Sequence, residues 1–479
     1  FIANEAIIGP GGQGGLFTAT AAGPFASAAW DEEVMNVYRG WPASVAVDQS
    51  RLIFANFPSV PGGIAWSELG LLTNFNVGAL PTDPIFELVP GKRQVLYVVP
   101  GMDASEFIFC DTGLLYIPIT PANPLKPGSI VFSTISEDEC GQVQPRRAGE
   151  FIIYATGGLN QLMAVRIFGA YTRAYKTDSI TELSAHLFDN IKAIAIMTAS
   201  ASFAERYIFI VNGDAAGTVV AGKYSLSKSN ELEGTVGWTP WTGGASLGQV
   251  SWVSVRGSNI LFCSNYFPNA IAGFGMVELL DDSRYLDASQ LYNTQPTGLP
   301  IPVGKGPLWY MPNGSVGLMD GPLGTRMMGT YLVDVDGFII PQGNGGEDLT
   351  SVNLVVGQTW TARLERFVPP VQDGQDVEQR MKKRRILRSE VYVKDSTGFL
   401  TQSLYSGQSG PLLPALGTAM RERRVSTWNQ GEDPTQPPPL REQAYIFRPA
   451  GWSHDPRWVI VKDTPGPLTI IENTTEVTV

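Results

Sequence analysis

The sequence predicts an all-β fold: a degenerate β-propeller, a loop-rich insertion and a C-terminal, β-sandwich-like platform domain. The first observation behind this prediction is a series of short runs rich in Val, Ile, Phe and Tyr, most of them bounded by Gly, Pro, Asn or Asp. The second is a turn-rich composition, with 52 Gly and 35 Pro in 479 residues. The third is the scarcity of helical periodicity, which we find only at residues 178–190, where Asp178 is placed as a cap, and at 378–385.

The short apolar runs are the expected strands, and hairpin turns separate some of them. Asp111-Thr112-Gly113 and Asn212-Gly213-Asp214 each lie between two such runs. No motif recurs at a fixed spacing, so the expected propeller is degenerate. The expected strands are residues 44–47, 51–55, 94–99, 106–110, 114–119, 151–155, 163–167, 207–211, 219–224, 252–255 and 259–263.

The character of the sequence changes along the chain and defines four expected segments. Residues 1–39 are an N-terminal arm with a Gly-rich stretch, and residues 40–288 are the propeller-like domain. Residues 289–353 are an insertion or linker with a hairpin at 330–341. Residues 354–479 are the C-terminal β domain.

Charge and hydropathy restrict the classes of protein to which the chain can belong. The net charge is −11, the pI is about 4.9 and only 16% of residues are charged, which argues against a sequence-specific DNA reader with a basic footprint. The low charge also suggests that much of the surface is buried against other subunits. The longest apolar stretches fall short of the ~20 residues needed to cross a bilayer. The first residue is Phe1, so we expect a processed or truncated start.

The residues that usually carry catalysis or bind cofactors are sparse. The cysteines Cys110, Cys140 and Cys263 are far apart and odd in number, which argues against a disulfide framework or a metal site. We interpret His186 as a partly buried helix residue, far from the second histidine, His454. Acidic clusters at 31–33, 137–139 and 281–282 lie beside turns, and no serine nucleophile motif occurs. We therefore expect neither enzymatic activity nor a cofactor.

One strongly basic segment is the candidate contact site. It spans residues 380–388, and a second basic cluster follows at 421–424. Such a run can contact phosphates or an acidic partner surface, whereas the alternative is a solvated or inter-subunit strand face. The candidate residues for a partner or DNA contact are Arg380, Lys382, Lys383, Arg384, Arg385 and Arg388.

Short motifs occur in a fixed order in two regions, at about residues 40–285 and 354–479. They lie at residues 40–47 (GWPASVAV), 49–55 (QSRLIFA), 64–75, 106–114, 143–155, 162–166, 178–188, 207–224, 356–365, 384–398 and 461–470. In this order they resemble the tail nozzle proteins, also called tail tubular or tail stabilisation proteins, of short-tailed bacteriophages (podoviruses). Residues 289–350 have no counterpart in this resemblance, Cys110 and Asp111 replace commoner residues, and 214–217 lengthen a turn.

The resemblance implies a structural protein of the virion, located in the phage tail. It implies a homo-hexameric ring that extends the channel of the portal and adaptor, with a propeller outside and the C-terminal domain as docking surface and channel wall. The implied partners are the adaptor (head-to-tail connector) ring, tail needle, tip or tailspike proteins, double-stranded DNA passing without sequence specificity, and the host outer membrane at the tip. Two alternatives remain open: a receptor- or glycan-binding propeller of the tail tip, and a polysaccharide-cleaving tail protein.

Overall fold

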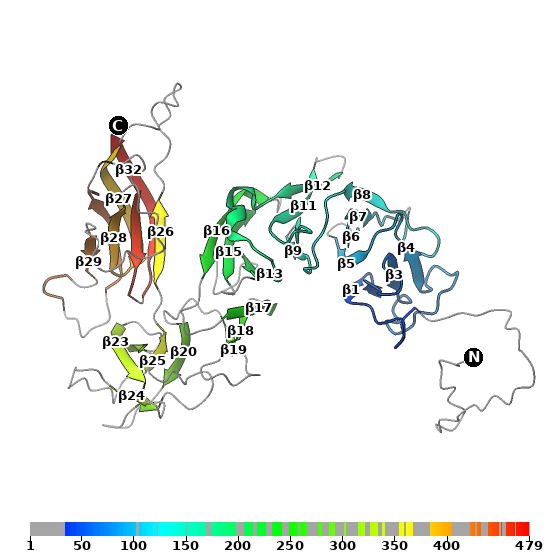
Figure 1. The fold of residues 1–479 in the computed structure, drawn as a ribbon, viewed down its shortest axis with the longest axis horizontal. Coiled ribbons are helices and arrows are strands. Elements are labelled where there is room, and N and C mark those ends of the chain that lie inside the picture. Colours follow the sequence, from blue (N-terminus) through cyan, green and yellow to red (C-terminus); the bar gives the residue numbers. More distant parts are fainter. Residues whose placement is uncertain are drawn as a thin grey trace, which may run out of the picture. The chain divides into compact units, whose positions relative to one another are not determined.

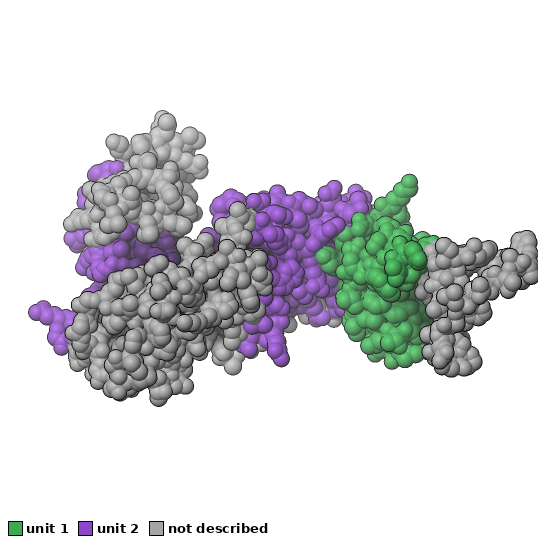
Figure 2. Space-filling view, turned by 60° about the horizontal axis from the view of Figure 1, so that its bottom comes forward, with its two compact units in different colours: residues 1–98, 125–130 green, residues 99–124, 131–479 purple. Residues whose placement is uncertain are grey.

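The fold is that of a computed structural model, and it confirms the all-β prediction. The chain divides into two compact units, residues 1–98 with 125–130 and residues 99–124 with 131–479, which Figure 2 distinguishes by colour. The structure describes residues 34–101, 105–121, 123–149, 151–168, 174–197, 206–213, 218–226, 232–241, 249–256, 259–265, 276–279, 287–292, 301–302, 315–320, 326–333, 338–340, 354–358, 361–366, 384–404, 422–426, 429–432, 439–449, 452, 457–464 and 466–478.

The first unit is organised by one four-stranded antiparallel sheet in the order β1-β2-β3-β4. The turn between its first two strands contains Gln49 and Ser50, both with positive φ angles of 44° and 61°, so the hairpin closes in two residues. Ile53, Ile64 and Trp66 are buried on one side of this sheet. The strands are β1 (Ser44–Asp48), β2 (Arg51–Ala55), β3 (Gly63–Trp66) and β4 (Ile85–Leu88).

Similar sheets follow one another along the chain (Figure 1). Two more have four antiparallel strands in sequential order before the central sheet of β13 to β16, and a three-stranded sheet comes after it. The strands are β5 (Val95–Pro100), β6 (Glu106–Cys110), β7 (Gly113–Ile117), β8 (Ser133–Ser136), β9 (Arg146–Ala148), β10 (Phe151–Ala155), β11 (Leu162–Phe168), β12 (Ala174–Ser179), β13 (Ala193–Met197), β14 (Arg206–Val211), β15 (Val219–Leu226), β16 (Leu232–Trp241), β17 (Gln249–Arg256), β18 (Asn259–Asn265) and β19 (Met276–Leu279). Successive meanders of this kind are the building blocks of β-propellers.

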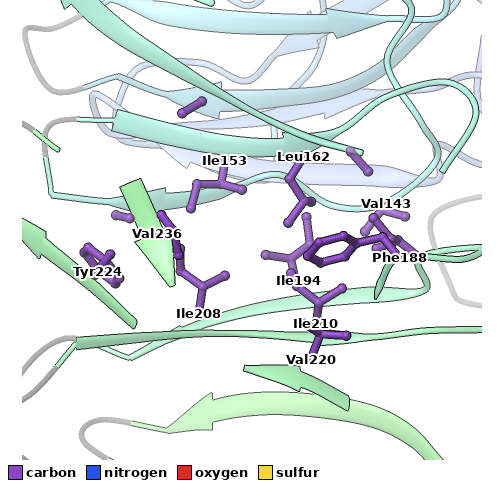
Figure 3. Close-up of a cluster of buried hydrophobic side chains, with 14 of the residues drawn as sticks. Val143, Ile153, Leu162, Phe188, Ile194, Ile208, Ile210, Val220, Tyr224 and Val236 are labelled. Carbon is purple, nitrogen blue, oxygen red and sulfur yellow. The ribbon is translucent and has the colours of Figure 1, made fainter. Parts of the chain in front are cut away.

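Alternating side chains of the central sheet pack against both neighbouring sheets. Ile194 and Ile208 belong to one buried cluster together with Ile153 and Leu162 of the preceding sheet, and Figure 3 shows these side chains facing one another. The intervening residues of β13 and β14 belong to a second cluster, which contains Val253 and Ile260 of the following sheet. Because a strand alternates its side chains, a run that is apolar at every position buries both of its faces. The sheets therefore stack face to face, as blades do.

The residues assigned to the insertion contribute to a six-stranded sheet in the order β20-β25-β22-β23-β24-β21. The hairpin expected at 330–341 is confirmed, since Leu332 pairs with Ile340 and Val333 with Ile339. Its turn at Asp336 lies outside the described residues. The strands are β20 (Asp287–Tyr292), β21 (Ile301–Pro302), β22 (Ser315–Asp320), β23 (Arg326–Val333), β24 (Phe338–Ile340) and β25 (Leu354–Gln358).

The C-terminal strands form a sandwich of two sheets, in the orders β26-β31-β28-β29 and β30-β27-β32. The interior between them contains Val391 and Phe447 from one sheet and Phe399, Trp458 and Ile460 from the other. The strands are β26 (Ala362–Arg366), β27 (Arg385–Ser396), β28 (Phe399–Leu404), β29 (Glu422–Val425), β30 (Arg441–Phe447), β31 (Arg457–Lys462) and β32 (Thr469–Thr478).

The helix expected at 178–190 is wrong in length and in its cap. Asp178 lies in strand β12, and only the 3-10 helix η1 (Glu182–Leu187) forms after it. His186 in this helix is exposed rather than partly buried. The helix expected at 378–385 falls largely outside the described residues, and Arg385 begins β27. The described part of the chain has no helix of the length and hydrophobicity needed to cross a membrane.

Candidate functional site

The basic candidate residues lie at the start of the long strand β27. Arg385 and Arg388 are exposed, and Arg384 directly precedes the strand. Arg380, Lys382 and Lys383 lie outside the described residues. A contact of these six residues with DNA or a partner remains a prediction.

Acidic neighbours compensate part of this basic charge. Arg388 forms a salt bridge with Glu390 on the same strand. In the register of β27 with β32, Arg388 also lies opposite Glu476. Glu390 therefore compensates the charge of Arg388, which reduces the attraction of its guanidinium for phosphate oxygens.

The second basic cluster is part of the same sandwich. On β29, the Nη1 atom of Arg423 donates to the carbonyl oxygen of Ile446 at 3.0 Å, and its guanidinium carbon lies 5.6 Å from the ring centre of Phe447. Arg424 forms a two-pronged salt bridge with Asp463, with 3.0 Å between Nη1 and Oδ1. Both arginines hold strands together at exposed positions.

The outer face of the three-stranded sheet carries a further polar pair. The hydroxyl of Tyr392 on β27 donates to Oε1 of Glu442 on β30 at 2.8 Å. This hydrogen bond to a carboxylate raises the pKa of Tyr392, since ionisation would place two negative charges together. The pair links two strands and leaves the face polar.

Lys462 is the one buried lysine of the described residues, with 2% of its surface exposed. Its Nζ donates to Oγ1 of Thr397 and to the carbonyl oxygen of Gly398, both at 2.7 Å. Burial lowers its pKa to about 8. These hydrogen bonds join β31 to the turn between β27 and β28, so the role of Lys462 is structural.

The other candidate groups do not come together as a site within the described residues. The acidic clusters at 31–33 and 281–282 lie outside them, and at 137–139 Asp138 accepts a hydrogen bond from Ser136 in a loop. No group of three or more possible metal ligands occurs in the described part. The backbone N–H of Cys140 donates to the carbonyl of Cys110, and burial raises the pKa of the Cys140 thiol to about 12, far from a reactive thiolate.

The sequence did not reveal the role of Arg51, which lies in the QSRLIFA motif. Arg51 is 2% exposed, and its guanidinium donates to the carbonyl oxygens of Ser67 at 2.6 Å, Asp83 at 2.8 Å and Pro81 at 2.9 Å. It thereby fixes the loop that joins β3 to β4. The sequence signal for this role is a charged residue at the start of an otherwise apolar strand. Such a residue is buried with the strand, and a buried charge requires hydrogen-bond partners.

Comparison with known proteins gives structural similarities only. No protein-family model matches the chain, and no curated protein matches it. Human WBSCR16 is similar over 67% of this chain and 87% of its own, at 10% identity and a TM-score of 0.30. A catalytically inactive virginiamycin B lyase from Staphylococcus aureus, solved with quinupristin, is similar over 50% of this chain and 84% of its own, at 11% identity and a TM-score of 0.26.

A third solved structure is similar at the same level. The extracellular domain of the one-component system BT4673 from B. thetaiotaomicron covers 86% of this chain and 56% of its own, at 9% identity and a TM-score of 0.24. None of these three proteins is described as a phage tail component. TM-scores this low carry no functional argument, so the function has to be argued from the residues.

Proposed function

We propose that this chain is a structural protein of a short-tailed phage virion, the subunit of a hexameric tail nozzle that conducts DNA during ejection. The observation that carries the proposal is the position of the nozzle-like motifs on the two β domains. Residues 49–55 contain the tight turn and Arg51 of the first sheet, and residues 461–470 contain Lys462 of the sandwich. The motifs thus coincide with residues that determine the architecture. The resemblance itself rests on the order of these motifs.

The charge distribution suits a conduit. A channel wall that lets DNA slide should not bind phosphates tightly, and the chain has a net charge of −11. Described arginines of the basic segments, Arg388 and Arg424, are engaged with carboxylates. In this proposal the sandwich supplies docking surface and channel wall, and DNA passes without sequence-specific contacts.

Exposed apolar side chains suit contacts with neighbouring tail proteins. In the first unit Tyr38 is 77% exposed, Trp41 64%, Val45 59% and Val47 57%. Val45 and Val47 lie on the same face of β1, and apolar side chains gathered on a surface mark protein interfaces. The proposed neighbours are the adaptor ring on one side and needle, tip or tailspike proteins on the other, with the host outer membrane beyond the tip.

The test is the assembly state of the full-length chain. We expect mass photometry to find six copies, and electron microscopy to show a closed ring whose lumen admits duplex DNA. A short duplex should show no saturable binding to the ring at about physiological salt, where a basic binding site would retain it. The proposal would be contradicted by a chain that remains a monomer or trimer, without a closed ring, at all concentrations and with purified adaptor present.

Exposed tryptophans favour a second candidate, a glycan-binding protein of the tail tip. Trp41, Trp252 and Trp452 are 64%, 47% and 51% exposed, and indole rings provide stacking surfaces. A glycan array with the full chain tests this candidate. Specific retention that Trp41→Ala abolishes, in a protein that forms no ring, would favour it over the nozzle. We propose no enzymatic activity, and shortening of purified capsule polysaccharide would overturn that.

A further inference from the structure

The C-terminal sandwich has two flanks, which the order of its strands defines. β30 and β32 are the two edges of one sheet, and β29 and β26 are the two edges of the other. Because Arg423 of β29 donates to the carbonyl of Ile446 on β30, these two strands share a flank. β32 and β26 therefore lie on the opposite flank, and Figure 1 shows β26 and β29 on opposite sides of this domain.

The β32 flank is an acidic open edge. Among the strands that the structure describes, only β27 pairs with β32. β32 (Thr469–Thr478) contains no Pro or Lys, and the charges that it carries against pairing with another chain are two carboxylates. The side chains of Glu472 and Glu476 are exposed on it.

The β29–β30 flank, defined by Glu422–Val425 and Arg441–Phe447, offers basic and apolar groups. Arg423 is exposed on β29 and Ile446 is 42% exposed on β30, whereas Arg424 is paired with Asp463 and Glu442 with Tyr392. A guanidinium has five N–H donors, so the bond of Arg423 to a single carbonyl leaves it able to bind a carboxylate as well. Arg423 on this flank and the exposed Glu472 and Glu476 on the β32 flank thus carry opposite charges.

We propose that the β32 flank of one copy binds the β29–β30 flank of the next copy, so that the sandwiches join head to tail. This inference rests on the proposed ring, because a contact between two different surfaces of one chain builds a closed ring when its rotation divides a full turn, and an open filament otherwise. β30 and β32 both pair antiparallel with β27 and so run in the same direction. With the strands along the ring axis, the rotation preserves this direction, and the new pair of strands is parallel.

Cross-linking of the full-length chain tests the proposal. Ala444 on β30 and Thr474 on β32 are exposed on the same face of the sheet, and each is replaced by cysteine. The background carries Cys263→Ser, since Cys110 and Cys140 are buried. With a short bismaleimide, we expect the double variant to give a ladder of covalent oligomers that ends at the ring. Each single variant should stay monomeric on a denaturing gel.

The outcomes separate this inference from the proposed function. Covalent dimers of Thr474→Cys alone would mean that β32 pairs with its own copy across a two-fold axis, which overturns the head-to-tail contact. A ring that forms without any cross-link in the double variant also overturns it, and leaves the nozzle proposal intact. A wild-type chain that does not assemble overturns both.

A charge-reversal cycle gives a second readout. Glu476→Lys and Arg423→Glu should each weaken assembly about tenfold or more, and the combined variant should recover most of the loss. Lys394→Glu, on the central strand of the same sheet, is the matched control and should assemble as the wild type does. Circular dichroism checks that each variant is folded. Additive losses in the combined variant, with all variants folded, would refute the pairing of these flanks.

Discussion

Replacement of Arg51 by Met tests whether a single buried guanidinium organises the first sheet. Met fills a similar volume but removes the donors to the carbonyls of Ser67, Pro81 and Asp83. Three hydrogen bonds to a charged group, at about 1.5–3 kcal/mol each, set an upper range of about 5–9 kcal/mol. Met also avoids the cost of burying a charge, and loop carbonyls can turn to water, so we expect a net loss of about 3 kcal/mol.

The assay has to show that the loss of unfolding free energy arises in the first unit. For a unit of this size, about 3 kcal/mol lowers the melting temperature of its transition by about 12–24 °C. We expect hydrogen exchange to rise first in the loop between β3 and β4, because its carbonyls lose their common donor. Arg147→Met is the matched control: Arg147 is exposed, its bonds to carbonyls are 3.3 and 3.4 Å long, and we expect a change below about 0.5 kcal/mol. Equal stability of the two variants, or unchanged exchange in the loop, would refute the role of Arg51.

Three further predictions concern the stacked sheets and the sandwich. Gly222→Ala places a Cβ 2.4 Å from the Trp238 ring and should lower the free energy of unfolding by about 1–3 kcal/mol. The control is Gly237→Ala, whose Cβ meets nothing within 4 Å and which should leave thermal unfolding nearly unchanged. Phe209→Ala removes a ring that is 0% exposed and contacts three further aromatic rings, and chemical denaturation should show a loss of about 3–5 kcal/mol. Burial lowers the pKa of Lys462 from 10.5 to about 8. Between these two pH values the unfolded chain binds more protons than the folded chain does. The stability contributed by Lys462 therefore rises as the pH is raised through that window, and it is lost as the pH falls through 8. The difference between wild-type and Lys462→Met unfolding free energies should therefore change by about 3 kcal/mol across that window, and a flat difference would contradict the burial of a charged amine.

The sequence predicts the buried strands best. Arg51–Ala55, Glu106–Cys110 and Phe151–Ala155 have the bounds expected from the sequence. Their runs of β-branched and aromatic residues end at turn-forming residues, so the composition of the strand and the flanking turn predict the same bounds. β16 (Leu232–Trp241) was not predicted, because its glycines and Pro240 break the pattern. It forms as an edge strand of its sheet, where proline is tolerated.

Tertiary contacts explain the helix that failed to form. The residues after Thr181 have the composition of an amphipathic helix, but Ser184 adopts a non-helical φ of −132°. Asp178 pairs with Arg166 and Lys176 in neighbouring strand positions instead of capping a helix. Contacts between strands outweigh the modest local propensity of a short segment.

The candidate site shows a different limit of sequence reasoning. Basic clusters are visible in the sequence, but only some of the groups that balance them are. Glu390 lies two residues from Arg388, whereas Arg424 pairs with Asp463 across 39 positions and Arg423 finds its carbonyl partner 23 positions away. Sequence reasoning therefore identifies where positive charge is concentrated, but not which of these charges are paired in the folded chain.

The first nozzle-like motif and the proposed contact flanks of the sandwich differ in what determines their residues. Residues 49–55 contain a tight turn and the buried Arg51, so their identity is required by the fold of the first sheet. The flanks of the sandwich are built from exposed side chains on edge strands, where the fold accepts many residue types. In the proposed ring, the neighbouring subunit determines such positions instead. A resemblance carried by buried motifs can therefore indicate architecture, whereas the subunit contacts of the proposed ring have to be inferred from edge strands and their charges, as at β32 and β29.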